Sequence, residues 1–199
     1  PKNPKDPERD RFILSKGHAA MALYSALAFK GFFPEEELDT FGKPNTKFAE
    51  HPDTGIPGVE AATGSLGHGL PLGVGMALAG RIQQRNYRVF ALLSDGECNE
   101  GTVWEAAMFA PAHKLENVVA IVDFNKWQAT GRSTKILALE PLPAKWESFG
   151  WSTYVIDGHN FEQLYNVLSK VPDGTGKPIA IIANTIKGKG VSFMEDDNN

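Results

Sequence analysis

The second half of the chain alternates between nearly continuous apolar runs and segments with helical spacing. Strands are predicted at residues 88–94, 117–124, 151–156 and 177–185, and helices at 102–114, 144–149 and 161–171. Strands that alternate with helices are typical of βαβ units and a parallel sheet. Because the runs are apolar throughout, both faces of the sheet are expected to be covered. The sequence therefore predicts an α/β fold, with a parallel sheet flanked by helices on both faces.

The first half is predicted to hold fewer regular elements. Its first eleven residues contain three prolines and alternate in charge, which is typical of an extended arm. A helix is predicted over 15–31 with Ser15 as its N-cap, and a short one from Pro34. Residues 42–65 have no period, and loops of this length inside a domain are usually functional or mobile. A glycine-rich turn is then predicted to lead into a helix within 66–85.

Composition and charge limit the classes of partner. The length fits one domain, residues 1–199. The net charge is −4 and the Lys and Arg residues are scattered, so no nucleic-acid partner is expected. The single cysteine, Cys98, cannot form an internal disulfide. No apolar run approaches about 18 residues, and no positively charged leader is present, so we expect a cytoplasmic protein without a membrane span.

Two oxygen-bearing side chains follow consecutive predicted strands. Asp95 comes directly after one strand, and Asn125 follows the next, one βαβ crossover later. Ligands of open parallel sheets bind beyond the carboxyl ends of the strands. A carboxylate and a carboxamide suit Mg²⁺, which leaves its other positions to water and phosphate oxygens. Either residue alone is better explained as a turn or cap residue. Together they favour a metal site.

The residues around this pair suit a diphosphate. Gly96 lacks a side chain where a phosphate approaches, and a helix that begins near Gly101 directs its positive end at an anion. A backbone carbonyl near Trp127 is a candidate further metal ligand, for which the side chain is immaterial. The sequence therefore predicts a metal-bridged diphosphate at the ends of two adjacent strands.

Several motifs carry a resemblance to a known family. The stretch "SDGECNEG" followed by "NKWQATG" resembles the diphosphate-binding signature of thiamine diphosphate enzymes, with Ser94 in place of the first glycine of a Gly-Asp-Gly triplet. The stretches "DRFILSKGHAAMALYSAL", "HPDTGIPGVEAATGSLGHGLPLGVGMALA", "EGTVWEAAMFAPAHKLENVVAIVDFN" and "TIKGKGVSFME" resemble the amino-terminal, diphosphate-binding domain of transketolase. The resemblance runs from Asp10 to Glu195 almost continuously.

The resemblance implies a cofactor and its ligands. Thiamine diphosphate is implied, with Mg²⁺ or Ca²⁺ held by Asp95, the side chain of Asn125 and the main-chain carbonyl of Trp127. The cofactor-binding residues that it implies are Gly64, Ser65, Leu66, His68, Asp95, Gly96, Glu97, Asn125 and Lys187. Many relatives carry glutamine in place of His68, and Lys187 is equally explained as part of a solvated strand end.

The same resemblance implies catalytic roles for four residues. His18 and His51 would face the substrate, bind hydroxyls of the donor sugar and move protons. Glu100 and Glu105 match acids at the subunit interface that couple to the partner's catalytic glutamate. Without the resemblance, the histidines are explained as structural or exposed residues, and the glutamates as residues that favour a helix N-terminus.

The chain is shorter than a whole transketolase of the family, and we expect it to be trimmed at both ends. The hypothesis is a split transketolase, in which a separate subunit carries the pyrimidine-binding and carboxy-terminal domains and the two chains assemble as a dimer or heterotetramer. The two subunits together would transfer a two-carbon ketol unit from a ketose phosphate to an aldose. The alternatives are a subunit of 1-deoxyxylulose-5-phosphate synthase or 2-oxo acid dehydrogenase type, and a non-catalytic diphosphate-binding module. Loops 42–68 and 126–142 are expected to be mobile without cofactor.

Overall fold

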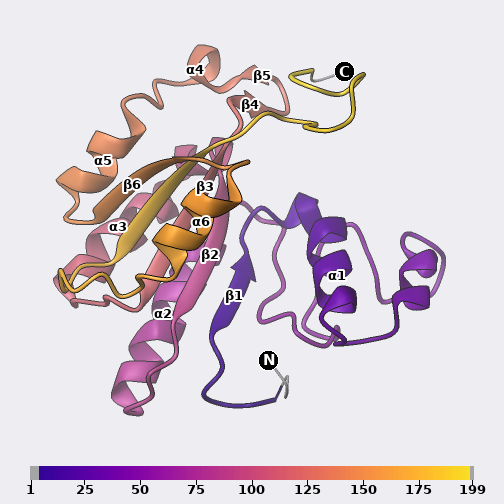
Figure 1. Cartoon of the computed structure of the whole chain (residues 1–199), viewed down its shortest axis with the longest axis horizontal. Coiled ribbons are helices and arrows are strands. Elements are labelled where there is room, and N and C mark those ends of the chain that lie inside the picture. The colour runs from indigo at the N-terminus through magenta and orange to yellow at the C-terminus, as the bar shows by residue number, and fades with distance from the viewer. Residues whose placement is uncertain (1–4, 198–199) are drawn as a thin grey trace.

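A five-stranded parallel sheet forms the centre of the molecule (Figure 1). The computed structural model describes residues 5–197. The strands follow the order β1 (Arg11–Leu14), β2 (Val89–Ser94), β3 (Val118–Phe124), β7 (Ile179–Asn184) and β6 (Ser152–Asp157). The four predicted strands are confirmed to within two residues at each end. Because β2 and β3 are parallel neighbours, the residues that follow them emerge at one edge of the sheet, as predicted.

Helices and short turns connect the strands. The helices are α1 (Ala20–Phe29), α2 (Gly69–Ile82), α3 (Gly101–Ala112), α4 (Ser133–Ile136), α5 (Leu142–Ser148) and α6 (Phe161–Leu168). Three 3₁₀ turns are η1 (Gly17–Ala19), η2 (Glu35–Thr40) and η3 (Gly96–Asn99), and β4 (Trp127–Gln128) forms an antiparallel hairpin with β5 (Gly131–Arg132). Of the described residues, none lies in a helix long and apolar enough to cross a membrane.

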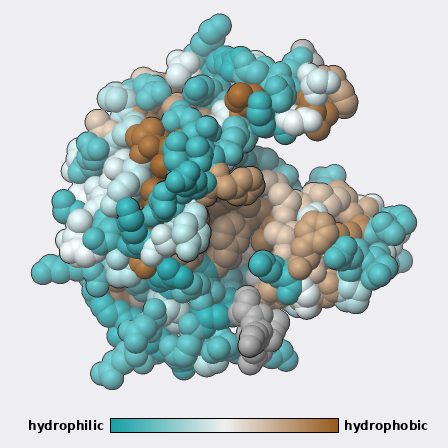
Figure 2. Space-filling model, in the orientation of Figure 1, coloured by the Kyte–Doolittle hydropathy of each residue, from teal (hydrophilic) through white to brown (hydrophobic). Residues whose placement is uncertain are grey.

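The helices cover the two faces of the sheet unequally. One face packs against α2, α3 and α5, where Leu70, Val103 and Trp146 are completely buried with the strand residues. The other face packs against α6, through partly buried leucines and a valine. The prediction of helices on both faces is confirmed, but Figure 2 shows a hollow between α1 and the main body, with apolar residues on its wall. Phe12 of β1 is 37% exposed and lines a cavity together with Leu23 and Leu27 of α1.

A separate small core lies beside the edge strand β1. It joins α1 and η2 to the long loop after η2, and Phe48 and Ile56 of that loop are each 1% exposed. The Tyr24 ring meets Phe48 edge-on at 5.2 Å, and its hydroxyl donates to the carbonyl of His51 at 3.2 Å. The predicted absence of regular structure in 42–65 is confirmed, and the buried side chains of Phe48 and Ile56 anchor the loop.

The predictions for residues 11–19 were partly wrong. The arm was predicted to lead directly into a helix, but Arg11–Leu14 pair with β2 as an edge strand. The helix begins only at Ala20, after η1. Ser15 is not a helix cap, because its backbone N–H continues the pairing with Leu92 O at 2.8 Å and its hydroxyl donates to Glu97. Four strand residues without local periodicity do not distinguish an edge strand from an arm.

Candidate functional site

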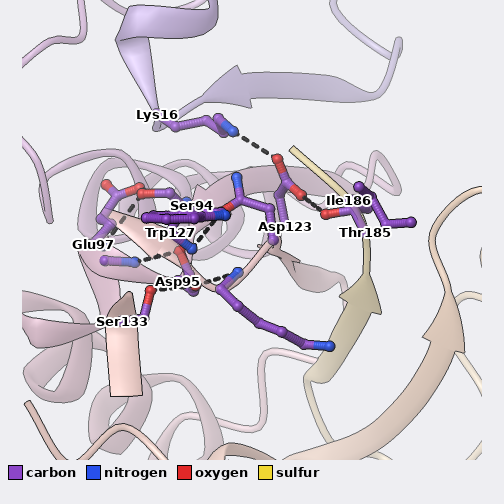
Figure 3. A network of polar contacts seen from close by, with 12 residues as sticks. Lys16, Ser94, Asp95, Glu97, Asp123, Trp127, Ser133, Thr185 and Ile186 are labelled. Atoms are coloured by element: carbon purple, nitrogen blue, oxygen red, sulfur yellow. Dashed lines mark hydrogen bonds and ion pairs between the residues drawn. The ribbon is translucent and has the colours of Figure 1, made fainter. Parts of the chain in front are cut away.

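The turn after β2 is built around a buried carboxylate. Asp95 is 0% exposed, and its Oδ1 accepts from the Gly96 N–H at 2.8 Å. Its Oδ2 accepts from the Lys126 N–H at 2.9 Å and from Ser133 Oγ at 2.7 Å (Figure 3). Burial raises the pKa of Asp95, and the hydrogen bonds from Ser133 and the two backbone groups oppose this effect. Asp95 thus joins the ends of β2 and β3 to the start of α4.

The segment after β3 supplies the second predicted ligand. Asn125 immediately precedes Lys126, whose N–H binds Asp95, and its Oδ1 accepts from the Trp127 N–H at 2.9 Å. The structure therefore brings the Asp95 turn and the Asn125 segment into direct contact, as the sequence predicted. In the described part of the chain, no group of three or more His, Cys, Asp or Glu residues is arranged to hold a metal. A set of one carboxylate, one carboxamide and one carbonyl leaves positions for phosphate oxygens and water.

An ion pair holds the β4–β5 hairpin from outside. Arg132 binds both carboxylate oxygens of Asp196 at 2.6 Å, and its guanidinium lies 3.9 Å from the centre of the Trp127 ring. Trp127 Nε1 also donates to Asp196 at 2.9 Å. Arg132, followed by Trp127, lowers the pKa of Asp196 to about 2. These contacts join Trp127, whose carbonyl is a predicted metal ligand, to the segment that follows β7.

An unpaired donor beside Gly96 indicates that the turn fits an anion. Gln128 Nε2 is buried and has no hydrogen-bond partner among residues 5–197. The side chain of Gln128 lies over Gly96, where an added Cβ would be 2.9 Å from Gln128 Cγ. A buried N–H without a partner is costly, and a phosphate oxygen is a suitable acceptor for it. The residues present therefore fit a diphosphate at this turn.

The glycine loop, residues 64–68, lies against the same turn. Gly67 is buried with a φ of +84°, and its N–H donates to Glu97 Oε1 at 2.8 Å. Its carbonyl accepts from Thr102 Oγ1 at 2.9 Å. Gly64 packs on His51, because a Cβ there would lie 3.0 Å from the imidazole. The loop thus brings predicted cofactor residues next to a predicted catalytic histidine.

A cleft of about 600 Å³ opens on the face of the sheet that α6 covers only in part. Its lining includes Lys16, His18, Asp123, Asn125, His159 and Lys187. Burial lowers the pKa of His18, and the charges of Lys16 and His51 lower it further, which favours the neutral imidazole. A neutral imidazole next to cations suits a group that accepts a proton from a bound hydroxyl.

Comparisons with known proteins agree with this geometry. Residues 1–199 match the family described as "Transketolase, thiamine diphosphate binding domain". The chain belongs to the transketolase family. A 6-deoxy-6-sulfo-D-fructose transketolase subunit from Clostridium sp. is 47% identical over 98% of this chain and 71% of its own length. An apulose-4-phosphate transketolase subunit from Phocaeicola vulgatus is 42% identical, over 98% of this chain and 69% of its own length.

Solved transketolase structures share the fold. The crystal structure of transketolase from Campylobacter jejuni superposes with a TM-score of 0.93 at 33% identity, over 98% of this chain and 32% of that chain. The chain therefore spans about a third of that transketolase. The predicted α/β fold, with helices on both sides of a parallel sheet, is the fold of the transketolase thiamine diphosphate binding domain.

Some predicted site residues lie apart from the diphosphate turn of this transketolase domain. His68 and Glu105 line a separate groove between α2 and α3. Glu97 is completely buried, so it contacts protein groups and not the cleft. Ser65 and Glu100 are exposed, at the glycine loop and at the start of α3. The roles predicted for these residues stay predictions.

An ion pair in the cleft of the transketolase domain was not predicted from the sequence. Lys16 Nζ donates to Asp123 Oδ2 at 2.6 Å, and Thr185 Oγ1 donates to Asp123 Oδ1 (Figure 3). Asp123 is an acid inside an otherwise apolar strand, which is a signal that the sequence contained. Gln128 and Ser133 gave no such signal, because their contacts with the turn depend on the hairpin and α4.

Proposed function

We propose that the chain is the thiamine diphosphate- and Mg²⁺-binding subunit of a split transketolase. Together with a separate subunit that carries the pyrimidine-binding domain, it transfers a two-carbon ketol unit from a ketose phosphate to an aldose acceptor. The observation that carries the proposal is the contact between Asp95 and the Asn125 segment at the ends of two adjacent strands. Two relatives named as transketolase subunits, of which this chain spans 71% and 69%, support the split arrangement.

In this proposal, Mg²⁺ or Ca²⁺ is held by Asp95, the Asn125 side chain and the Trp127 carbonyl. Gln128 Nε2, which has no partner among residues 5–197, would donate to a phosphate oxygen, and a bound metal would supply positive charge against the diphosphate. Asp95 is suited to the role because backbone and hydroxyl donors already fix both of its oxygens in position. Gly96 leaves room for the Gln128 side chain, because a Cβ at this position would lie 2.9 Å from Gln128 Cγ.

The residues of the cleft position substrate and move protons. Thiamine diphosphate supplies the nucleophilic carbon that carries the ketol unit. His18 in the cleft and His51 beside the glycine loop bind sugar hydroxyls, and His18, whose lowered pKa favours the neutral imidazole, accepts a proton from one of them. The Lys16–Asp123 pair and Lys187 keep the floor and rim of the cleft polar. These groups fit the hydroxyls and charges of a sugar phosphate.

The partner-facing surface in this proposal lies on α3. Glu100 and Glu105 are exposed there, and Leu72, Met108 and Phe109 expose apolar surface on α2 and α3. This surface contacts the pyrimidine-domain subunit, in a dimer or heterotetramer. The cytoplasmic location stays a prediction.

The test is a reconstituted ketol-transfer assay. The chain is purified alone and with the product of a neighbouring gene that encodes a pyrimidine-domain protein. Transfer from a ketose phosphate is expected only for the pair, and only with thiamine diphosphate and Mg²⁺. Transfer by the chain alone would contradict the split arrangement. Activity with pyruvate and none with a ketose phosphate would favour the synthase type of enzyme instead.

A further inference from the structure

Glu97 is a charged side chain in the interior, beside the diphosphate turn. It is 0% exposed. Its Oε1 accepts from Ser15 Oγ and from the Gly67 N–H at 2.8 Å, and its Oε2 accepts from the Ser94 N–H at 3.3 Å. Within residues 5–197, no Lys, Arg or His lies close enough to form an ion pair with it. Burial raises the pKa of Glu97, and the hydrogen bond from Ser15 opposes this most.

The three donors come from three separate parts of the chain. Ser15 follows β1 and leads to Lys16 and His18, Gly67 belongs to the glycine loop, and Ser94 ends β2. A buried carboxylate without a cation is expensive to retain, and an apolar side chain of similar size fills the same volume. Its specific contribution is therefore to hold the three segments at fixed positions relative to one another.

The contact with Gly67 is the most consequential for a ligand. Gly67 adopts a φ of +84° and is held from both sides, by Glu97 on its N–H and by Thr102 on its carbonyl. Its neighbours in the chain are Leu66 and His68, which are predicted cofactor residues. Because glycine reaches many other backbone conformations at little cost, removal of one of the two contacts frees the loop.

We propose that Glu97 is a positioning residue that fixes the glycine loop against the diphosphate turn. It sets the separation between the part of the site that grips the ring of thiamine diphosphate and the part that grips its diphosphate. The inference rests on the proposed function. It assigns Glu97 no contact with the cofactor, in contrast to the direct role that the sequence predicted.

The amide variant Glu97→Gln tests this inference sharply. All three groups that face the carboxylate are donors in the structure. Glutamine keeps one acceptor oxygen and adds an NH₂ group that faces a backbone donor. Where the NH₂ group takes the place of Oε1, the contact with Gly67 is lost, and in either orientation the remaining contacts are no longer charge-assisted, so the loop is held less firmly to the turn.

The experiment measures two ligands by titration calorimetry on the full-length chain, together with any partner chain that copurifies. The probes are Mg²⁺–thiamine diphosphate and Mg²⁺–pyrophosphate. For Glu97→Gln we expect affinity for the former to fall about 10- to 100-fold, as for the loss of one or two hydrogen bonds to a charged group. Affinity for the latter is expected to change less than about twofold, because Asp95 and Asn125 are untouched. Glu116→Gln, an exposed acid before β3, is the matched control.

The outcomes separate this inference from the proposed function. Wild-type protein that binds neither probe overturns the proposed function and the inference with it. Wild-type protein that binds both, with an equal loss or no loss on both probes in Glu97→Gln, overturns the inference alone. If Glu97→Gln does not fold, Ser15→Ala removes one of the three donors instead. In this variant the affinity for Mg²⁺–thiamine diphosphate is expected to fall several-fold, and the affinity for Mg²⁺–pyrophosphate is expected to stay nearly unchanged. An equal loss, or none, on both probes in Ser15→Ala would then contradict it.

Discussion

Replacement of Asp95 by asparagine separates its structural role from its role as a metal ligand. Three donors face the carboxylate: the Gly96 N–H at 2.8 Å, the Lys126 N–H at 2.9 Å and Ser133 Oγ at 2.7 Å. Asparagine satisfies Lys126 and Ser133 with its single oxygen and turns its NH₂ group toward the Gly96 N–H. One hydrogen bond is lost, and the other two are no longer charge-assisted.

The expected loss of stability follows from these contacts. An unmade hydrogen bond at a buried group costs about 1–3 kcal/mol. Burial raises the pKa of Asp95, so removal of the charge offsets part of this loss. The expected decrease in the free energy of unfolding therefore lies near the lower end of this range, at about 1 kcal/mol. For a domain of this size, about 1 kcal/mol corresponds to a fall in Tm of about 2–4 °C. The variant is therefore expected to fold.

The expected loss of ligand affinity is larger. Interactions with a charged group contribute about 1.5–3 kcal/mol, and 1.4 kcal/mol is tenfold, so Mg²⁺-dependent affinity for thiamine diphosphate falls about 10- to 150-fold. Calorimetric titrations with Mg²⁺ and with EDTA isolate the metal-dependent part, and scanning fluorimetry gives Tm. Asp39→Asn, an exposed acid in η2, serves as control. Wild-type metal-dependent affinity in Asp95→Asn would refute Asp95 as a ligand.

Three further predictions concern the histidine, the glycine loop and the hairpin. In an NMR titration His18 is expected to show a pKa below its ordinary value, because of burial first and then the charge of Lys16, and Lys16→Met is expected to raise it. As the pH falls, His18 is protonated in the unfolded state at a higher pH than in the folded state. Protonation of His18 therefore decreases the free energy of unfolding once the pH falls below the ordinary pKa of histidine. Gly67→Ala is expected to destabilise by about 1–3 kcal/mol, because a Cβ at a φ of +84° meets Thr102 Oγ1 at 2.5 Å. Arg132→Ala is expected to accelerate proteolysis within 127–132, because the ion pair with Asp196 is lost.

The glycine and arginine variants each have a matched control. Gly174→Ala has a similar φ of +80° but open space around the Cβ, so it isolates backbone strain from the clash at Gly67. An equal loss of stability in both variants would contradict the packing argument. Arg85→Ala removes an exposed ion pair with Glu8, away from the hairpin. The same digestion pattern for both arginine variants would contradict the role of the Arg132–Asp196 ion pair. An unchanged His18 pKa in Lys16→Met would contradict the effect of the Lys16 charge on His18.

The sequence predicted the sheet well because its signals are local. An apolar run of six or seven residues that ends in Ser94 or Phe124 indicates a buried strand wherever its neighbours lie. The crossover between them restricts β2 and β3 to a parallel arrangement, and their order in the chain makes adjacency the simplest outcome. Asp95 and Asn125 were therefore predictable as neighbours from the sequence.

Other contacts of the site had no local signal. The strand β1 has four residues, and its partner β2 begins at Val89, so its pairing becomes apparent only when the sheet forms. Asp123 was visible as an acid in an apolar strand, but its partners Lys16 and Thr185 come from two other segments. Figure 2 shows a further feature of this kind, the hollow beside α1, which depends on how far the helices extend over the sheet.

The sequence by itself determined the α/β class, the parallel strands and the edge of the sheet at which Asp95 and Asn125, the predicted metal ligands, lie. Only the tertiary structure decided that Glu97 is enclosed by three donors, that Gln128 leaves a donor unpaired, and that Arg132 and Asp196 join two distant segments. The physical reason is range. Periodicity and turn preference act within a few residues, whereas burial and the pairing of polar groups depend on which segments the fold brings into contact.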